Sequence, residues 1–126
     1  MSKIYSLGKE SIQLNDEYLL EIEEKTDGGY KWKEVNLKSE SDNINIGFFY
    51  TYNYSCSREW MRYNSRYIAI LATYNIGYDY TDPYVKVLFD IENKQFVKAS
   101  DDELMDIYVE SFKGVSKKKT KKISKR

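Results

Sequence analysis

The sequence predicts a single β-rich domain of the α+β class, with about seven short, mainly antiparallel strands, one short inserted helix and a C-terminal helix. A chain of 126 residues is long enough for one modest hydrophobic core. Short apolar segments separated by Gly, Asn and Asp turn signals run through residues 11–98, and a helical apolar stripe follows them. We therefore assign residues 1–114 to one globular domain and expect residues 115–126 to form a disordered basic tail.

Four candidate strands lie in the first half of the chain. Residues 11–15 and 17–26 come first. The sequence DGG at 27–29 then predicts a hairpin turn, because glycine reaches positive φ without a steric penalty. Residues 30–37 alternate between two faces, and a polar loop leads from them into a strand at 44–54.

The strand predicted at 44–54 carries apolar and aromatic side chains at alternate positions. On a regular strand one face would hold Ile44, Ile46, Phe48, Tyr50, Tyr52 and Tyr54. We expect the first half of this row to be buried and its tyrosines to emerge at the rim of the core. For Tyr52 and Tyr54, a binding role and a place at the edge of the core have equal support.

A short helix is predicted over residues 57–67, where the apolar period changes. Trp60, Tyr63 and Tyr67 are spaced i, i+3 and i+7, which suits a helix better than a strand. Ser57 is the expected N-cap of this helix.

In the second half of the chain, the sequence predicts the central strand of the sheet and a second hairpin. Residues 66–75 form the most apolar segment and indicate a central strand, and a loop follows at 74–84. Residues 84–91 and 95–98 then indicate two strands of a hairpin.

The clearest helix begins after Ser100. Ser100 and Glu103 match a capping box, and the acidic residues of the first turn suit the positive end of the helix dipole. The predicted core-facing stripe consists of Leu104, Met105, Tyr108, Val109 and Phe112, and Gly114 supplies the stop.

The residue types that most catalytic and metal sites need are missing. The chain has no histidine, which is the commonest general base and metal ligand. Its single cysteine, Cys56, excludes zinc-finger spacings and internal disulfides. Neither of the common glycine-rich phosphate-binding sequences occurs. We therefore expect a protein that is not an enzyme and that holds no metal or cofactor.

The net charge of zero conceals an asymmetry. Residues 115–126 hold seven basic residues and no acidic one, which leaves 13 basic and 20 acidic residues in 1–114, a net charge of −7. The domain is acidic and the tail is cationic. No apolar run approaches the roughly 20 residues of a membrane span, and the N-terminal residues MSKIYSLGKES lack the apolar core of a secretory signal. We expect a cytoplasmic protein without a membrane partner.

Arginine is concentrated in one segment. Arg58, Arg62 and Arg66 are the only arginines before the final residue, and their even spacing places them on one face of a helix or of a strand. With Trp60 and Tyr63 they have the composition of an interface hot spot or of a surface that grips phosphates and stacks bases. The alternative, three solvated charges paired with the many acids of the domain, has equal support.

Our leading functional hypothesis is a binding protein for an anionic partner, which is nucleic acid, a nucleoprotein or an acidic protein surface. The expected contacts are Arg58, Arg62, Arg66, Trp60, Tyr63, Tyr52 and Tyr54, and the tail residues Lys117, Lys118 and Lys119. The small size and the Tyr-, Ile-, Asn- and Lys-rich composition are typical of viral or mobile-element accessory proteins that inhibit a host factor. For such a protein the host cytoplasm is the expected location.

Residues 11–50 also resemble the repeat of the cyanovirin-N lectin family. The resemblance rests on Ile12-Gln13-Leu14, Leu19, Thr26-Asp27-Gly28-Gly29-Tyr30, Val35-Asn36-Leu37-Lys38 and Asn43-Ile44-Asn45, with Asp90-Ile91-Glu92-Asn93 as the closing turn of a second repeat. The family's paired cysteines are missing, and Glu23 stands at one of their positions. The resemblance implies our alternative function, a carbohydrate-binding module, whose shallow sugar pocket is lined by Glu24, Thr26, Asp90, Ile91, Glu92 and Asn93.

Overall fold

The computed structural model describes residues 4–52, 58–73, 75–76, 79–80 and 82–112. Within these residues there are ten strands and one helix. In chain order they are β1 (Tyr5–Gln13), β2 (Leu19–Asp27), β3 (Tyr30–Lys38), β4 (Asn43–Tyr52), β5 (Arg58–Tyr63), β6 (Tyr67–Thr73), β7 (Asn75–Ile76), β8 (Asp79–Tyr80), β9 (Tyr84–Asp90), β10 (Gln95–Phe96) and α1 (Asp101–Ser111). The β-rich, antiparallel α+β class is confirmed, although the strands outnumber the predicted seven. Among the described residues, no helix has the length and apolar character needed to cross a membrane.

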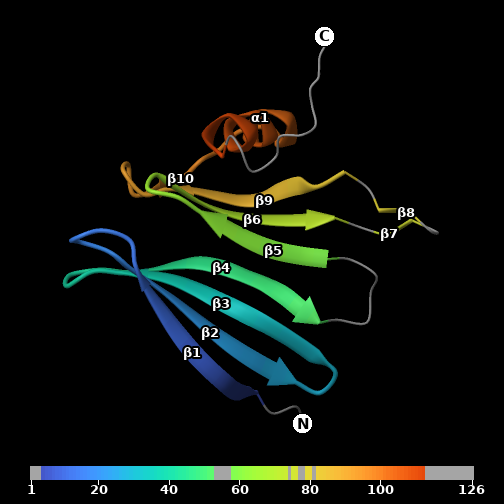
Figure 1. Ribbon diagram of the computed structural model, residues 1–126, viewed down its shortest axis with the longest axis horizontal. Helices are drawn as coiled ribbons and strands as arrows, with labels where there is room; N and C mark the ends of the chain where they lie inside the picture. The colour runs from blue at the N-terminus through green and yellow to red at the C-terminus, as the bar shows by residue number, and fades with distance from the viewer. Residues whose placement is uncertain (1–3, 53–57, 74, 77–78, 81, 113–126) are drawn as a thin grey trace.

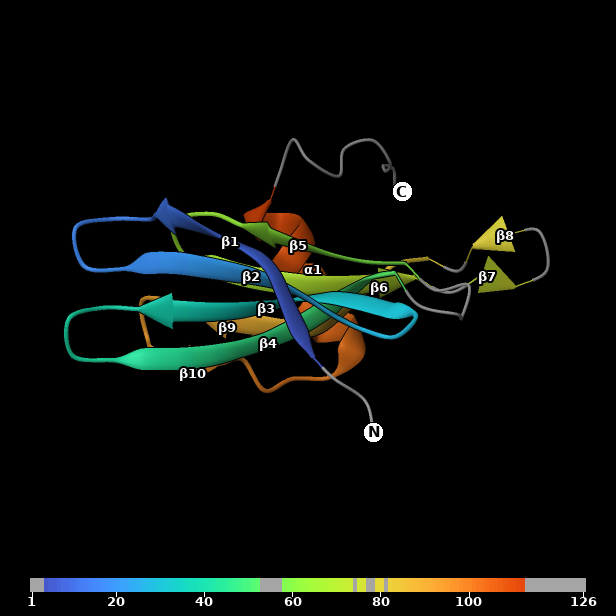
Figure 2. The ribbon, with the colours of Figure 1, turned by 90° about the horizontal axis from the view of Figure 1, so that it is seen from below.

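The strands form two antiparallel sheets that stack face to face, and α1 lies on the far side of the second sheet (Figure 1). The first sheet has the order β1-β2-β3-β4 and the second the order β10-β9-β6-β5, while β7 and β8 pair as a separate ribbon. Seen from below, the first sheet lies over the second (Figure 2). The described fold therefore has three layers: sheet, sheet and helix.

Two hydrophobic cores hold these layers together. The first lies between the sheets and includes Leu20 of β2 and Ile68 of β6. The second lies between the second sheet and α1 and includes Leu71 of β6 and Tyr108 of α1. Because β6 is covered on both sides, six of its seven residues are buried, which explains its continuous apolar run. β6 pairs with both β5 and β9, which confirms the predicted central strand.

A β-bulge in β4 exchanges the two faces of the strand halfway along. The register against β3 shifts at Ile46, and the next residue, Gly47, has a φ of +145°, which other residues rarely adopt. Ile46 and Phe49 consequently face the core, whereas Phe48 is 44% exposed. The prediction that the alternate residues of 44–54 share one face is therefore wrong, because the extra residue moves Phe48 and Tyr50 to the opposite face, and a second register shift pairs Tyr52 with Lys31 on the inner side.

The helix predicted over 57–67 is also wrong within the described residues, because β5 occupies most of this segment and pairs antiparallel with β6. The Asn64 side chain closes the turn between the two strands by accepting two backbone hydrogen bonds, at 2.9 and 2.7 Å. In a hairpin, alternate residues of β5 reach both cores, Trp60 the second and Met61 the first. The turn formed by the Asn64 side chain therefore determines the local structure, although the spacing of the aromatic residues suits a helix. Ser57 lies outside the described residues.

The predicted C-terminal helix and both predicted hairpins are confirmed, but Val109 of the predicted core-facing stripe is exposed. The Ser100 hydroxyl accepts a hydrogen bond from the Glu103 N–H at 3.2 Å, and the Glu103 carboxylate accepts one from the Ser100 N–H at 3.0 Å. These two bonds complete the capping box. Gly28 turns the β2–β3 hairpin with a φ of +63°, and β9 pairs with β10 in the second hairpin. Gly114 lies outside the described residues.

A polar contact fastens the two sheets together where β4 meets β5. Glu59 accepts a hydrogen bond from the Tyr50 N–H at 3.0 Å and another from Lys86 Nζ at 3.2 Å. Because β4 is the edge of the first sheet, Glu59 satisfies a backbone donor that no further strand can pair.

Candidate anion-binding surface on β5

The arginine-rich strand β5 lies at one edge of the second sheet and presents alternate residues to its two faces. Arg58, Trp60 and Arg62 point to the helix side, because the β6 partners of Trp60 and Arg62 are Leu71 and Ala69 of the second core. Both arginines are exposed, and Trp60 is partly buried against the second core. We call Arg58, Trp60 and Arg62 the β5 patch.

Two of the predicted contact residues lie on other surfaces. Tyr63 pairs with Ile68 of the first core, so its ring points to the opposite face of β5, where it is 41% exposed. Tyr52 ends β4 and is 54% exposed. Tyr54 lies outside the described residues. The β5 patch therefore brings together three of the predicted residues and excludes these tyrosines.

Arg66 is the last residue of the β5–β6 turn, and its side chain contacts the end of β9, the strand on the other side of β6. Its guanidinium donates to both carboxylate oxygens of Asp90, at 3.3 and 3.1 Å, and lies 3.6 Å from a Glu92 oxygen. The hydrogen bond to Asp90 is the main cause that raises the pKa of Arg66 above its ordinary value. Burial by itself would raise the pKa of Asp90, but hydrogen bonds from Arg66 and Asn93 hold it below its ordinary value. Arg66 therefore stabilises the β9–β10 turn.

The C-terminal end of α1 lies beside the β5 patch. The Asn64 side chain donates to the carbonyl oxygen of Ser111 at 3.0 Å, across 47 residues of sequence. One turn earlier in the helix, Tyr108 meets Arg62. Burial raises the pKa of Tyr108, and the charge of Arg62 together with its hydrogen bond to the phenol opposes this rise. Sequence reasoning missed Asn64 and Tyr108, because nothing in the local pattern shows that the helix returns to this turn.

The chain leaves the described fold close to the β5 patch. Phe112, the last described residue, is buried in the second core beside Tyr108. The seven basic residues of the sequence at 115–126 begin shortly after it. Lys117, Lys118 and Lys119 belong to this segment and lie outside the described residues. Their part in binding stays a prediction.

Most acidic residues of α1 lie toward the other end of the helix. Asp101, Asp102 and Glu103 form its first turn, and a helix of 11 residues is about 16 Å long. Asp106 and Glu110 are exposed closer to the C-terminal end. The positive groups of the β5 patch and the acidic first turn are therefore separated along the helix.

The residues that the lectin resemblance implies lie in two separate places. Glu24 and Thr26 are near the β2–β3 turn, at the far end of β2. Residues 90–93 span the last residue of β9 and most of the β9–β10 turn, in which Lys94 reaches Glu17 at 3.5 Å, just before β2 begins. The two groups are thus at opposite ends of β2, roughly 20 Å or more apart. Asp90 and Ile91 are also buried, so the structure does not bring these residues into one pocket.

A hollow of about 450 Å³ lies at the tip of the first sheet. It is lined by Glu24, Gly28, Gly29, Lys31, Thr51 and Tyr52. Glu24 from the lectin resemblance and Tyr52 from the aromatic hypothesis therefore line the same hollow. Neither prediction placed these two residues together, because they belong to strands that β3 separates.

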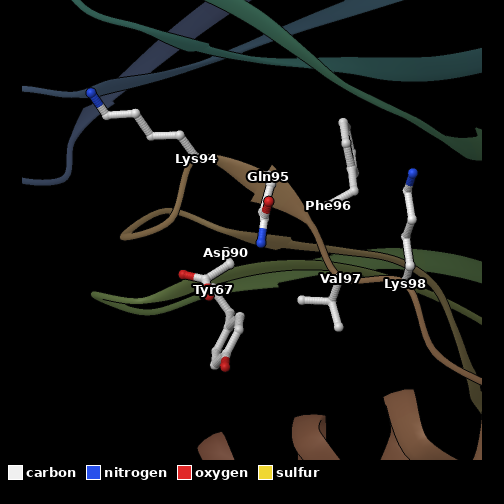
Figure 3. Close-up of a pocket in the computed structure, with 7 residues that line it drawn as sticks. All are labelled: Tyr67, Asp90, Lys94, Gln95, Phe96, Val97 and Lys98. Atoms are coloured by element: carbon white, nitrogen blue, oxygen red, sulfur yellow. The ribbon is translucent and has the colours of Figure 1, made fainter.

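A larger hollow of about 750 Å³ lies beside β10 (Figure 3) and is lined by Tyr67, Asp90, Lys94, Gln95, Phe96, Val97 and Lys98. Its charged groups do not converge. Arg66 and Asn93 already occupy the Asp90 carboxylate, and Lys94 extends away from Asp90 (Figure 3) and pairs with Glu17. Among the described residues, no three His, Cys, Asp or Glu side chains are grouped closely enough to hold a metal ion.

No protein-family model, curated protein or solved structure matches the chain. The resemblance to the cyanovirin-N family therefore stays a prediction. The chemistry of the β5 patch carries the functional proposal.

Proposed function

We propose that the protein is a non-enzymatic binding protein that contacts an anionic macromolecule through the β5 patch and residues 115–126. One observation carries the proposal: the end of α1, from which this basic segment continues, is fastened to the turn that follows β5. The described part of the chain therefore ends, at Phe112, close to the β5 patch, and the seven basic residues follow shortly after it in the sequence. This support is electrostatic: a cationic patch and a basic segment that begins close to its end would both attract a polyanion to a domain whose net charge is negative.

The spacing of the β5 patch suits a polyanion with regular charges. Arg58 and Arg62 are four residues apart on a strand, about 13 Å, which is the rise of about four phosphates on one strand of a duplex. A guanidinium group also matches the two oxygens of a phosphate better than an ammonium group does. Trp60 lies between the arginines and offers an aromatic edge to a base or to the backbone. Nucleic acid is therefore the anionic partner that we favour.

The test measures the affinity of the full chain for single-stranded and duplex DNA and RNA as a function of salt concentration. The double variant Arg58→Glu/Arg62→Glu should bind at least about tenfold more weakly. The slope of its logarithmic affinity against the logarithm of salt concentration should be shallower, by the amount expected for about two lost phosphate contacts. The variant Lys9→Glu/Lys31→Glu is the matched control, since it makes the same charge change on the first sheet. Removal of residues 115–126 should weaken binding further without changing the preferred strand form.

Two results would contradict the proposal. One is equal loss of affinity in the β5 double variant and in the control, which would indicate a general charge effect. The other is an unmodified chain that binds none of these nucleic acids at low salt. Circular dichroism of each variant verifies that the fold is retained.

A further inference from the structure

The solvent-facing side of the first sheet carries a cluster of four aromatic rings that neither core uses. Tyr50 lies at its centre, with the ring centroids of Tyr30, Trp32 and Phe48 at 6.0, 6.4 and 5.3 Å. Tyr30 and Phe48 remain 41% and 44% exposed. We call these four residues the aromatic face. The opposite side of the same sheet supplies the first core, so the rings are not needed to complete it.

The fold builds the aromatic face by means of the bulge in β4. After the bulge, Phe48 pairs with Glu34 and Tyr50 pairs with Trp32, on the outer side of β3. Gly47 itself faces the second sheet, since a Cβ atom at this position would lie 3.4 Å from Ile70 Cδ1. Without the extra residue, Phe48 and Tyr50 would continue the inward row of Ile46. The chain thus exposes rings that a regular strand would bury.

The charges around the aromatic face are nearly balanced. The outer face of the first three strands carries Lys9, Lys25, Lys38, Glu21, Glu23 and Glu34, with Asp27 at the tip. Several of these charges are already paired, since Lys25 lies 3.0 Å from Glu34 and Lys38 lies 2.8 Å from Glu21. The Trp32 indole donates to Glu34 at 3.2 Å. An aromatic centre with a polar, paired border is the usual composition of a protein interface.

Charge and area together indicate which partner fits. Residues 1–114 have a net charge of −7, so the domains of two copies repel each other over most of their surface, although residues 115–126 bring the whole chain to zero. The outer side of the first sheet is nearly neutral, so this repulsion is weakest there. Four strands of about nine residues cover roughly 19 by 30 Å, and side chains enlarge this area toward the about 800 Å² per partner of a standard interface.

We infer that the aromatic face is where two copies of this chain associate, first sheet against first sheet, about a two-fold axis. In such an interface each copy contributes the same residues, so a surface with both lysines and glutamates is self-complementary. The β5 patch lies on the helix side of the second sheet and stays accessible in both copies. The pair would therefore present two β5 patches to one polyanion.

The experiment is sedimentation velocity of the full chain over a wide range of concentrations. The expected result is a monomer–dimer equilibrium whose dissociation constant rises at least about tenfold in Phe48→Lys. Phe96→Lys is the matched control. Phe96 is 41% exposed on β10 and makes an edge contact at 5.0 Å with Phe89, as Phe48 does at 5.3 Å with Tyr50. The control should leave the dissociation constant unchanged.

The inference is overturned if the full chain is monomeric at every concentration, or if both variants weaken the dimer equally. Should Phe48→Lys lose its fold by circular dichroism, Tyr30→Lys provides a second change in the same face, at a side chain that is 41% exposed. Sedimentation of the protein alone does not measure nucleic-acid binding. The self-association can therefore be refuted while the proposed function stands, and the proposed function can be refuted while the self-association stands.

Discussion

Asp90 is the polar residue on which the β9–β10 turn depends. Buried at the end of β9, it receives two hydrogen bonds from Arg66 and two from Asn93, with the shortest at 2.7 Å. All the acceptor sites that face the protein are thus used. The Asp90 carboxylate stabilises the fold because its hydrogen-bond donors on Arg66 and Asn93 are in place. Removing its charge would leave some of these donors without an acceptor.

We predict that Asp90→Asn lowers the free energy of unfolding at neutral pH by about 1–3 kcal/mol. The pKa of Asp90 lies below its ordinary value of 3.8 in the folded chain. Its contribution is therefore complete above that value and is lost as the pH falls through the lower folded-state pKa. Urea unfolding across the acidic range should show the two chains converging as the pH decreases.

Glu92→Gln is the control for this prediction. Glu92 lies 3.6 Å from the same arginine, but its side chain is 66% exposed. Exposed ion pairs contribute little, so the change should be below about 0.5 kcal/mol. A larger effect of Glu92→Gln than of Asp90→Asn would contradict the assignment of Asp90 as the main partner of Arg66.

At the scale of elements, β4 shows how one glycine changes the role of a whole strand. Its sequence alternates regularly, and a regular strand would bury Phe48 and Tyr50. The bulge at Ile46 and the positive φ of Gly47 place them outside, while Phe49 fills the core. A local backbone conformation thus decides which aromatic side chains are available to a partner.

We predict that Gly47→Ala destabilises the fold by about 1–3 kcal/mol, because alanine is strained at a φ of +145°. The near-ultraviolet circular dichroism of Trp32 and Tyr50 should change if the bulge relaxes. Gly28→Asn is the matched control, since its φ of +63° suits asparagine and no atom lies within 4 Å of the added Cβ. Equal effects of the two substitutions would contradict a special role of the bulge.

At the scale of the whole molecule, α1 forms the third layer and closes the second core. Leu71 and Leu88 of the second sheet would face water without Leu104, Tyr108 and Phe112 of the helix. Each buried side chain of this size contributes about 1.5–3 kcal/mol, which is a large share of the total stability of a small domain.

We predict opposite outcomes for two shortened chains. A chain ending after Gly114 should unfold with the same free energy as the full chain, within about 0.5 kcal/mol. A chain ending after Ala99 should lose its cooperative thermal transition or aggregate, because it exposes the second core. Thermal unfolding with light scattering measures both, and a cooperative transition in the shorter chain would show that α1 is dispensable.

The elements that sequence reasoning predicts well are those with local causes. The DGG turn, the capping box at Ser100 and the continuous apolar run of β6 follow from glycine geometry, from hydrogen bonds within one turn and from burial on both faces. Each involves residues that are close together in the chain. The β-rich class follows because most segments repeat these short-range patterns.

The candidate site was predicted only in part, because some of its contacts join residues that are far apart in the sequence. Arg58, Trp60 and Arg62 share a face on any regular strand, so their clustering was visible in the spacing. The position of Arg66 was not visible in the spacing. Asn64 turns the chain before it, and the Arg66 guanidinium donates hydrogen bonds to Asp90, which is far along the sequence.

The amino-acid sequence by itself determined the class, the local turns and caps, and the separation of an acidic domain from a basic terminal segment. Only the tertiary structure decided that Phe48 and Tyr50 face outward and that the end of α1 meets the β5–β6 turn. Both depend on contacts between elements: the first on the register of β4 against β3, the second on packing of α1 across the second sheet. The pattern of apolar residues within a segment does not predict such contacts, because they depend on residues in other elements.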